Sequence, residues 1–146
     1  MAYVLGMNAK LYYNTGSYGS PTWTEISNVR DVTLSLERGD SDITTRGGGG
    51  WRQSVATIAD GSVDFQMVWD TTDTAFSAIK TAFIDATTVE FLVLDGSSST
   101  SGNQGLRATM AVTSFSRNEG LEDALTVDVS AKTAYSDNAP AWYSVP

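Results

Sequence analysis

The stretch Gly61–Trp69 reads G-S-V-D-F-Q-M-V-W, in which Val63, Phe65, Met67 and Trp69 stand at every second position and Ser62, Asp64 and Gln66 alternate with them. Because successive side chains of a strand point to opposite faces, this period of two predicts a strand with one buried and one solvated face. The preceding stretch Trp51–Ile58 predicts a second strand, and Ala59-Asp60-Gly61 predicts the turn that joins the two. The sequence around this stretch therefore favours antiparallel strands.

The same kind of pattern extends along the chain on both sides. Further strands are predicted at Ala9–Tyr13, Trp23–Leu36, Thr88–Leu94, Leu106–Arg117 and Glu122–Thr133. We expect a mainly β fold, an antiparallel β-sandwich or partly closed barrel with one packed α-helix. Residues 1–134 would form this domain with a long loop at 37–51, and residues 135–146 would form a C-terminal tail.

One helix interrupts the strands, in D-T-T-D-T-A-F-S-A-I-K-T-A-F-I-D at residues 70–85. Phe76, Ile79 and Phe83 recur at helical spacing, and Asp70, Thr71 or Thr72 is the expected N-cap. The next strand, Thr88–Leu94, is apolar on both faces. We therefore expect it to be covered on both sides, by the helix or by a neighbouring subunit.

Composition excludes several classes of function. The chain has no cysteine and no histidine, so disulfides, Cys/His zinc sites and imidazole bases are ruled out. Nine Lys and Arg against seventeen Asp and Glu give a net charge of -8, which opposes binding to a phosphate backbone. The N-terminus shows no signal peptide, and no run is long enough to span a membrane. We expect no cofactor, no metal and no membrane partner.

The stretch Leu36–Trp51, L-E-R-G-D-S-D-I-T-T-R-G-G-G-G-W, invites several chemical interpretations. A phosphate-binding loop would need Gly-Lys-Ser/Thr where Trp51-Arg52 follows the glycines, and an EF-hand starting at Asp40 would need a glycine and a glutamate that are missing. The Arg-Gly-Asp-Ser text matches an adhesion motif, but nothing else indicates an extracellular animal protein. Ser77-Ala78-Ile79-Lys80 has the spacing of a serine–lysine pair without the remaining motifs of that enzyme class. We therefore expect no enzyme.

Two interpretations of this stretch remain open from the residues alone: a disordered surface loop, or a segment that orders against another copy of the chain. The second rests on apolar anchors combined with mixed charges, which set affinity and register. The candidate interface residues are Glu37, Arg38, Asp40, Asp42, Ile43, Arg46, Trp51 and Arg52. In the tail, Trp142 and Tyr143 are candidates for docking onto the same subunit or a neighbour.

Three stretches, taken in order, resemble the tail tube protein (major tail protein) of long-tailed bacteriophages. They are R-G-D-S-D-I-T-T-R at 38–46, W-R-Q-S-V-A-T-I-A-D-G-S-V-D-F-Q at 51–66 and T-S-F-S-R-N-E-G-L-E-D-A-L-T-V-D-V-S-A-K-T at 113–133. The resemblance covers roughly Ala9–Thr133, and the Asp-Ile/Val-Thr-Thr segment adds Thr44 and Thr45 to the candidate interface. The four glycines and the Arg-Gly-Asp-Ser text depart from the family pattern.

The resemblance implies a β-sandwich subunit of the virion tail, made in the cytoplasm of a bacterial host. Such subunits assemble into stacked, hexameric rings that form a hollow conduit for DNA ejection. Implied partners are further copies of the chain and the tape measure, initiator and terminator proteins, while DNA passes without specific binding. Residues 37–51 would contact neighbouring subunits, and Asp64 and Asp128 are candidates to face an acidic lumen.

Two alternatives accompany this expectation. The first is an inner tube protein of a contractile tail or of a secretion system, which shares the architecture. The second is a receptor- or carbohydrate-binding β-sandwich, a stable monomer with an exposed aromatic platform at Tyr12, Tyr13 or Trp142.

Overall fold

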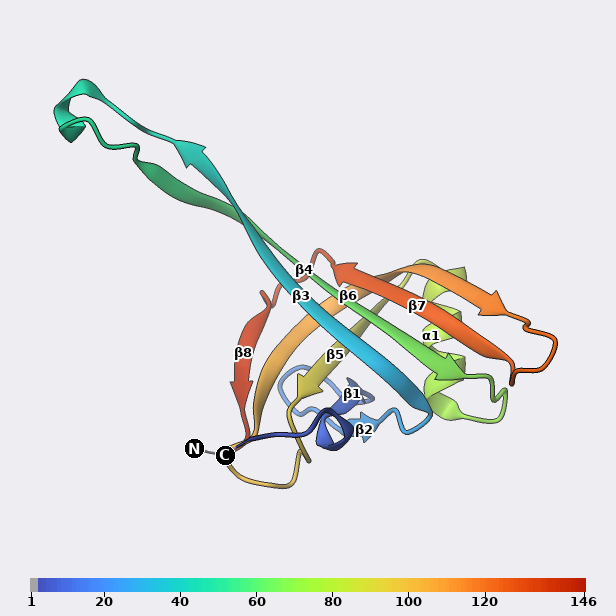
Figure 1. Cartoon of the computed structure of the whole chain (residues 1–146). Helices are drawn as coiled ribbons and strands as arrows, with labels where there is room; N and C mark the ends of the chain where they lie inside the picture. Colours follow the sequence, from blue (N-terminus) through green and yellow to red (C-terminus); the bar gives the residue numbers. More distant parts are fainter. Residues whose placement is uncertain (1–2) are drawn as a thin grey trace.

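The computed structural model describes residues 3–146, in which eight strands form one antiparallel sheet and a single α-helix packs on it (Figure 1). The strands are β1 (Lys10–Asn14), β2 (Trp23–Glu25), β3 (Val29–Asp42), β4 (Ser54–Val68), β5 (Thr88–Leu94), β6 (Gln104–Asn118), β7 (Thr126–Thr133) and β8 (Ala141–Ser144). The helix α1 is Thr74–Ile84, and short 3-10 turns lie at Gly6–Asn8 and Arg46–Gly48.

Strand β6 belongs to both halves of the sheet, whose order is β2-β1-β5-β6-β7-β4-β3. Its first half pairs with β5 and its second half with β7, and the register shifts between Val112 and Ser114. Such an irregularity bends a strand, so the sheet folds over at β6 into two layers (Figure 1). The prediction of an antiparallel, sandwich-like β fold with one helix is confirmed, and the sheet does not close into a barrel.

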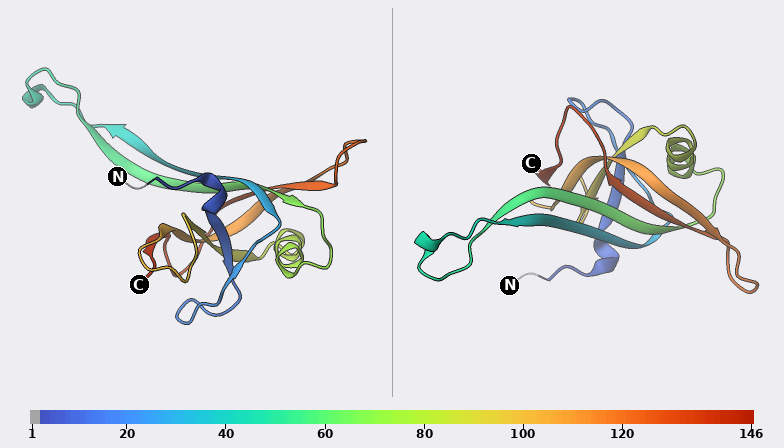
Figure 2. Two further views of the ribbon diagram at one scale, coloured as in Figure 1. Left: turned by 60° about the horizontal axis from the view of Figure 1, so that its bottom comes forward. Right: turned by 90° about the horizontal axis from the view of Figure 1, so that it is seen from above.

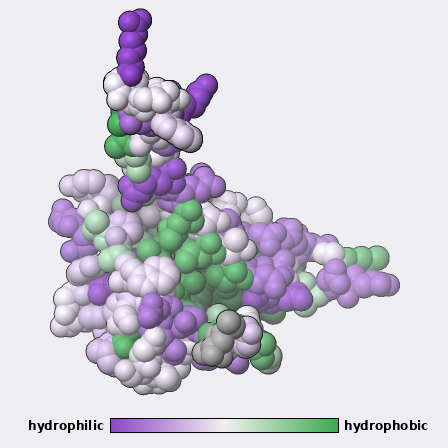
Figure 3. Space-filling view, turned by 60° about the vertical axis from the view of Figure 1, so that its left-hand side comes forward, coloured by the Kyte–Doolittle hydropathy of each residue, from purple (hydrophilic) through white to green (hydrophobic). Residues whose placement is uncertain are grey.

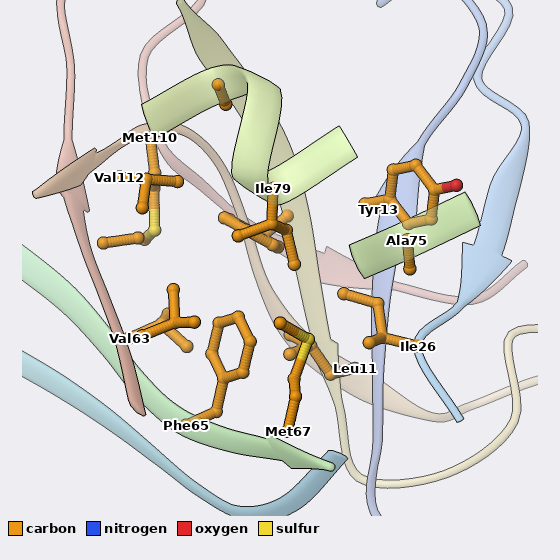
Figure 4. Packing of buried hydrophobic residues seen from close by; sticks show 14 of the residues in the cluster. Leu11, Tyr13, Ile26, Val63, Phe65, Met67, Ala75, Ile79, Met110 and Val112 are labelled. Carbon is orange, nitrogen blue, oxygen red and sulfur yellow. The ribbon is translucent and has the colours of Figure 1, made fainter. Parts of the chain in front are cut away.

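The core fills the space between these layers and the helix (Figure 4). Val63, Phe65 and Met67 of β4 are almost fully buried, which confirms the alternation from which the fold was predicted. Phe76 and Ile79 of α1 meet them from the other side, and the rings of Phe65 and Phe91 pack edge to face. The burial of these apolar side chains is the main force that holds the layers together.

The helix begins later than expected. Asp73 is the N-cap, and its carboxylate accepts a hydrogen bond from the backbone amide of Phe76 at 3.4 Å. The predicted caps are wrong because the Asp70 carboxylate instead accepts bonds from the amide and hydroxyl of Thr72, in the turn before the helix. Phe83 remains 39% exposed, so it lies at the edge of the apolar helix face, stacked on Phe115.

Three strand predictions are wrong in their boundaries. The strand expected at Glu122–Thr133 begins only at Thr126, because residues 119–125 form the turn after β6. The expected turn at Ala59-Asp60-Gly61 does not form, because β4 runs straight through it while Asp60 pairs with Glu37 and Gly61 with Leu36. Conversely, the single strand expected at Trp23–Leu36 is broken into β2 and β3, and Ile26 between them points into the core. Long-range pairing overrides the local turn signal at Asp60-Gly61.

Strand β5 has the predicted bounds and is covered on both faces. Phe91 faces the main core, while Leu92 and Leu94 pack in a second cluster with Tyr12 and Val145. The cover on this second face comes from the chain's own C-terminal segment. Within the tail, residues 141–144 form β8, which pairs with β6 along residues 104–107.

A largely buried ion pair fixes the loop between β1 and β2 to the sheet. Arg107 contacts Glu90 at 3.0 Å, and the side chains of the pair are only 12% and 10% exposed. The Arg107 guanidinium also lies 3.8 Å from the ring centroid of Tyr18 and donates to its carbonyl oxygen at 2.7 Å. Asn14 donates to Glu90 at 2.7 Å, so both charges are satisfied by several partners.

Candidate assembly surfaces

A long β-hairpin projects from the body of the molecule, and we call residues 37–60 the arm (Figures 1 and 2). It forms because β7 stops pairing with β4 at Ser62, whereas β3 and β4 continue to pair outward as far as Asp42 and Ser54. The long loop expected at 37–51 is therefore wrong for Glu37–Asp42, which is strand. Only residues 43–53 form the connecting loop, and we call these the arm tip.

The arm tip has defined local structure. Asp42 accepts a bond from the hydroxyl of Thr44 and another from its amide at 2.8 Å, and these two bonds, the hydroxyl's first, lower the pKa of the Asp42 carboxyl. The amide of Gln53 donates to the Thr44 hydroxyl at 2.9 Å, which links the two ends of the tip. Gly49 and Gly50 adopt φ values of 69° and 87°, in the left-handed region that favours glycine.

All ten candidate interface residues lie on the arm or its tip, and every one is exposed. Trp51 is 77% exposed and Ile43 is 52% exposed, although both are large apolar side chains. Sequence analysis missed two further exposed residues, Val55 and Ile58, on the returning strand of the arm. The missed signal was the apolar run V-A-T-I-A, which has no partner in the core of its own subunit.

A groove at the foot of the arm continues this apolar surface onto the body. Its lining combines apolar residues with charged ones: Leu36, Ala59, Leu106, Ala134 and Pro140 lie beside Glu37, Arg38 and Asp60. Figure 3, seen with the arm at the top, shows hydrophobic side chains gathered on the body below it. The foot of the arm and the arm itself thus expose apolar surface together.

Asp64 and Asp128 lie on the polar face of the sheet, opposite the core. Asp64 stands in register between Thr33 and Ser130, and its carboxylate accepts a bond from the Ser130 hydroxyl. Asp128 accepts bonds from Gln66 at 3.0 Å and from Asn118, at the end of β6, at 2.6 Å. The structure therefore brings both predicted residues to one face, together with neighbouring hydroxyl and amide groups.

This polar face is also acidic. Two shallow grooves on it are lined by five carboxylates and one ammonium group: Asp31, Glu37, Asp60, Asp64, Asp128 and Lys132. Because carboxylates outnumber the cation, the face has a negative potential at neutral pH. A polyanion that passed along this face would be repelled by it.

The two candidate docking residues of the tail contact their own subunit. The Trp142 indole donates to the side-chain oxygen of Gln104 at 2.9 Å, while most of its ring stays exposed. The Tyr143 ring packs edge to face on Trp23, with the centroids 6.2 Å apart. Within the described residues, the tail thus closes the second apolar cluster.

The model of one protein family, described as phage tail tube protein, matches residues 8–135 of the chain. The chain belongs to this family. It is a structural subunit of the virion tail, as its resemblance to that family implied. The observed fold fits this membership, because the matched residues span every strand except β8.

Solved structures share the fold of this tail tube protein at low sequence identity. A gene transfer agent tail, refined with C6 symmetry, has a TM-score of 0.73 at 18% identity, and the match covers 96% of this chain and 98% of that chain. The SPP1 tail tube has a TM-score of 0.74 at 11% identity, covering 97% and 80%. A chain of the anti-feeding prophage baseplate scores 0.65 at 8% identity, covering 99% and 98%. No curated protein sequence matches.

The structure also bears on the predicted aromatic platform, on metal sites and on membrane-spanning helices. The aromatic platform expected of a carbohydrate-binding module is wrong for Tyr12 and Tyr13, which are buried in the two apolar clusters. Among residues 3–146, no group of three or more acidic side chains is arranged to hold a metal ion. No helix in the same part of the chain is long and apolar enough to cross a membrane.

Proposed function

We propose that this tail tube protein assembles into stacked hexameric rings that form the hollow conduit for DNA ejection, with the arm as the joint between subunits. The observation that carries the proposal is the arm itself. A two-stranded ribbon is marginally stable alone, and this one exposes Ile43, Trp51, Val55 and Ile58 to solvent. Contact with another copy would cover these side chains and supply the stabilisation that the isolated ribbon lacks.

The likeness to the gene transfer agent tail, whose structure has C6 symmetry, supports six subunits per ring. In such an assembly the ten candidate residues, from Glu37 through Arg52, serve as contacts to neighbouring subunits and to the adjacent ring. Tape measure, initiator and terminator proteins are the further partners at the centre and ends of the tube. The protein contributes no catalysis in this role.

The part of the acidic face that lies on the body of the sheet, outside the arm, is the proposed lining of the lumen. Its carboxylates, including Asp64 and Asp128, repel phosphate groups, so DNA can slide through without binding. Replacing both residues with lysine should leave tubes intact and slow DNA ejection, because the lysines would attract the phosphates. Ejection from particles that carry the doubly substituted tube protein measures this effect, and an unchanged rate would contradict the placement of these residues in the lumen.

A second candidate is an inner tube protein of a contractile tail or secretion system. The observation that favours it is the likeness to a chain of the anti-feeding prophage baseplate. Co-purification of tubes with a sheath protein from infected cells would select this candidate. Bare tubes of one protein would select the non-contractile tail.

Negative-stain electron microscopy across a concentration series, paired with light scattering, tests the proposal. We expect rings or hollow tubes, alone or after addition of the tail initiator complex. A matched variant has residues 39–58 replaced by Asn-Gly, which joins the paired residues Arg38 and Ala59 with a tight turn. This variant should stay folded and monomeric. A wild-type protein that remains monomeric with the initiator complex, or an armless variant that still forms tubes, would refute the proposal.

A further inference from the structure

The turn between β6 and β7, residues 119–125, lies at the opposite end of the molecule from the arm tip. All three views in Figures 1 and 2 place these two features at opposite extremes. The turn reads E-G-L-E-D-A-L, and we call it the acidic turn. Two surfaces at opposite ends of one subunit can meet only between different copies of the chain.

The two ends carry opposite charge. The arm tip contains Arg46 and Arg52, and the carboxylate at its edge, Asp42, is bonded to the amide and hydroxyl of Thr44. The acidic turn contains Glu119, Glu122 and Asp123 and no cation. Arg117 at the end of β6 contacts only the first of these carboxylates, at 3.4 Å. Within residues 3–146, neither arginine of the tip has an ionic partner. Charge complementarity of this kind selects and orients a partner.

Both ends also expose large apolar side chains. Leu121 at the apex of the acidic turn is fully exposed, although leucine gains by leaving water. Trp51 and Ile43 of the arm tip are exposed as well. An apolar anchor surrounded by charged groups is the usual arrangement at the centre of a protein interface.

We propose that the arm tip of one copy docks on the acidic turn of a second copy in the adjacent ring. Arg46 and Arg52 face Glu122 and Asp123, and Leu121 packs against Trp51. A contact between opposite ends of identical subunits is heterologous, and a heterologous contact that does not close into a ring repeats along an axis. Placed between rings, this contact holds successive rings in register. The inference rests on the proposed function and adds the surface that receives the arm.

Charge reversal with compensation tests this pairing. Arg46→Glu with Arg52→Glu should raise the concentration needed for tube formation at least tenfold, and Glu122→Arg with Asp123→Arg should do the same. Mixing or combining the two reversals should bring it back to within about threefold of the wild type. A control with the same change in net charge, Lys80→Glu with Arg30→Glu, alters exposed residues outside both ends and should not respond to the acidic-turn reversal.

The outcomes separate this contact from the proposed function. Wild-type tubes together with reversals that have no effect, or with reversals that fail to compensate each other, would overturn the contact and leave the tube function standing. A wild-type protein that forms no rings or tubes with the initiator complex would overturn both. Thermal unfolding of each variant, with an unchanged midpoint, shows that the reversals act on assembly.

Crosslinking through introduced cysteines locates the partner directly. The natural chain has no cysteine, so only the introduced thiols can react. A variant with Thr45→Cys and Leu121→Cys, assembled and treated with a short bis-maleimide, should give a ladder of covalent multimers that continues beyond six subunits. Each single variant should give no ladder. A ladder that stops at one ring, or no crosslinking in intact tubes, would refute a contact between adjacent rings.

Discussion

Trp51→Ala should weaken assembly while leaving the folded subunit as stable as before. The indole of Trp51 is 77% exposed and lies on the arm tip, away from both apolar clusters. Truncation of an exposed side chain removes little buried surface, and surface substitutions usually change stability by less than about 0.5 kcal/mol. The loss should therefore appear only when a second copy is present.

The magnitude follows from the exposed area. An aromatic side chain buries roughly 200 Å² when covered, so 77% exposure leaves about 150 Å² for a partner to cover. At about 25 cal/mol per Å², complete coverage contributes close to 4 kcal/mol per subunit, and half coverage about 2 kcal/mol. Each 1.4 kcal/mol corresponds to about a factor of ten, so half coverage implies about a thirtyfold shift in the critical concentration.

Light scattering over a concentration series measures this shift, and thermal unfolding at low concentration measures the stability of the subunit. Tyr135→Ala is the matched control, because Tyr135 is a 93% exposed aromatic residue outside the arm. We expect its critical concentration to change less than that of Trp51→Ala. If Trp51→Ala assembles at the wild-type concentration, the arm tip is not an anchoring contact and the reasoning fails.

Three further predictions concern the subunit itself. Arg107→Ala should lower the free energy of unfolding by about 3 kcal/mol in urea titrations, because it leaves a buried carboxylate unpaired. Lys10→Ala breaks an exposed pair and should lower it far less; equal losses would contradict this. Because the folded chain lowers the pKa of Asp42, the bonds from Thr44 stabilise the arm tip at a pH above the ordinary carboxyl pKa. This stabilisation is lost as the pH falls through the lowered pKa of Asp42. Thr44→Val should move that pKa upward in an NMR titration, and no movement would exclude the hydroxyl as its cause. Truncation of residues 135–146 should lower the melting temperature, since it uncovers the second apolar cluster; an unchanged midpoint would show that the tail is dispensable.

The sequence predicts those strands that have one face in the core. Val63, Phe65 and Met67 alternate with polar residues because the inner half of β4 separates the core from solvent. Thr88–Leu94 was placed with its correct bounds because both of its faces are buried, which requires a continuous apolar run. In both strands the pattern of burial determines which positions are apolar, so the order of residues reveals the strand.

The arm could not be predicted in the same way. From Glu37 to Asp42 both faces of β3 are exposed, so no core selects apolar residues at alternate positions. Asp60-Gly61 carries the chemistry of a tight turn, yet it lies mid-strand because β4 pairs with β3 on both sides of it. Gly61 also has close neighbours there: a Cβ atom would lie 3.1 Å from the methyl group of Thr133. Local propensity fails where pairing between distant segments determines the conformation.

The acidity of the chain bears on both the proposed lumen and the proposed role of the arm. A net charge of -8 per subunit suits a conduit for DNA, but it also makes identical subunits repel one another. Assembly therefore needs close contacts that offset this repulsion, and the arm supplies both ionic and apolar groups for such contacts. Its tip carries Arg46 and Arg52 together with the exposed apolar side chains of Ile43 and Trp51, while the four carboxylates of the arm lie on its two strands. We expect a subunit built this way to stay apart from its copies in dilute solution and to join them where a preformed ring presents the complementary surface.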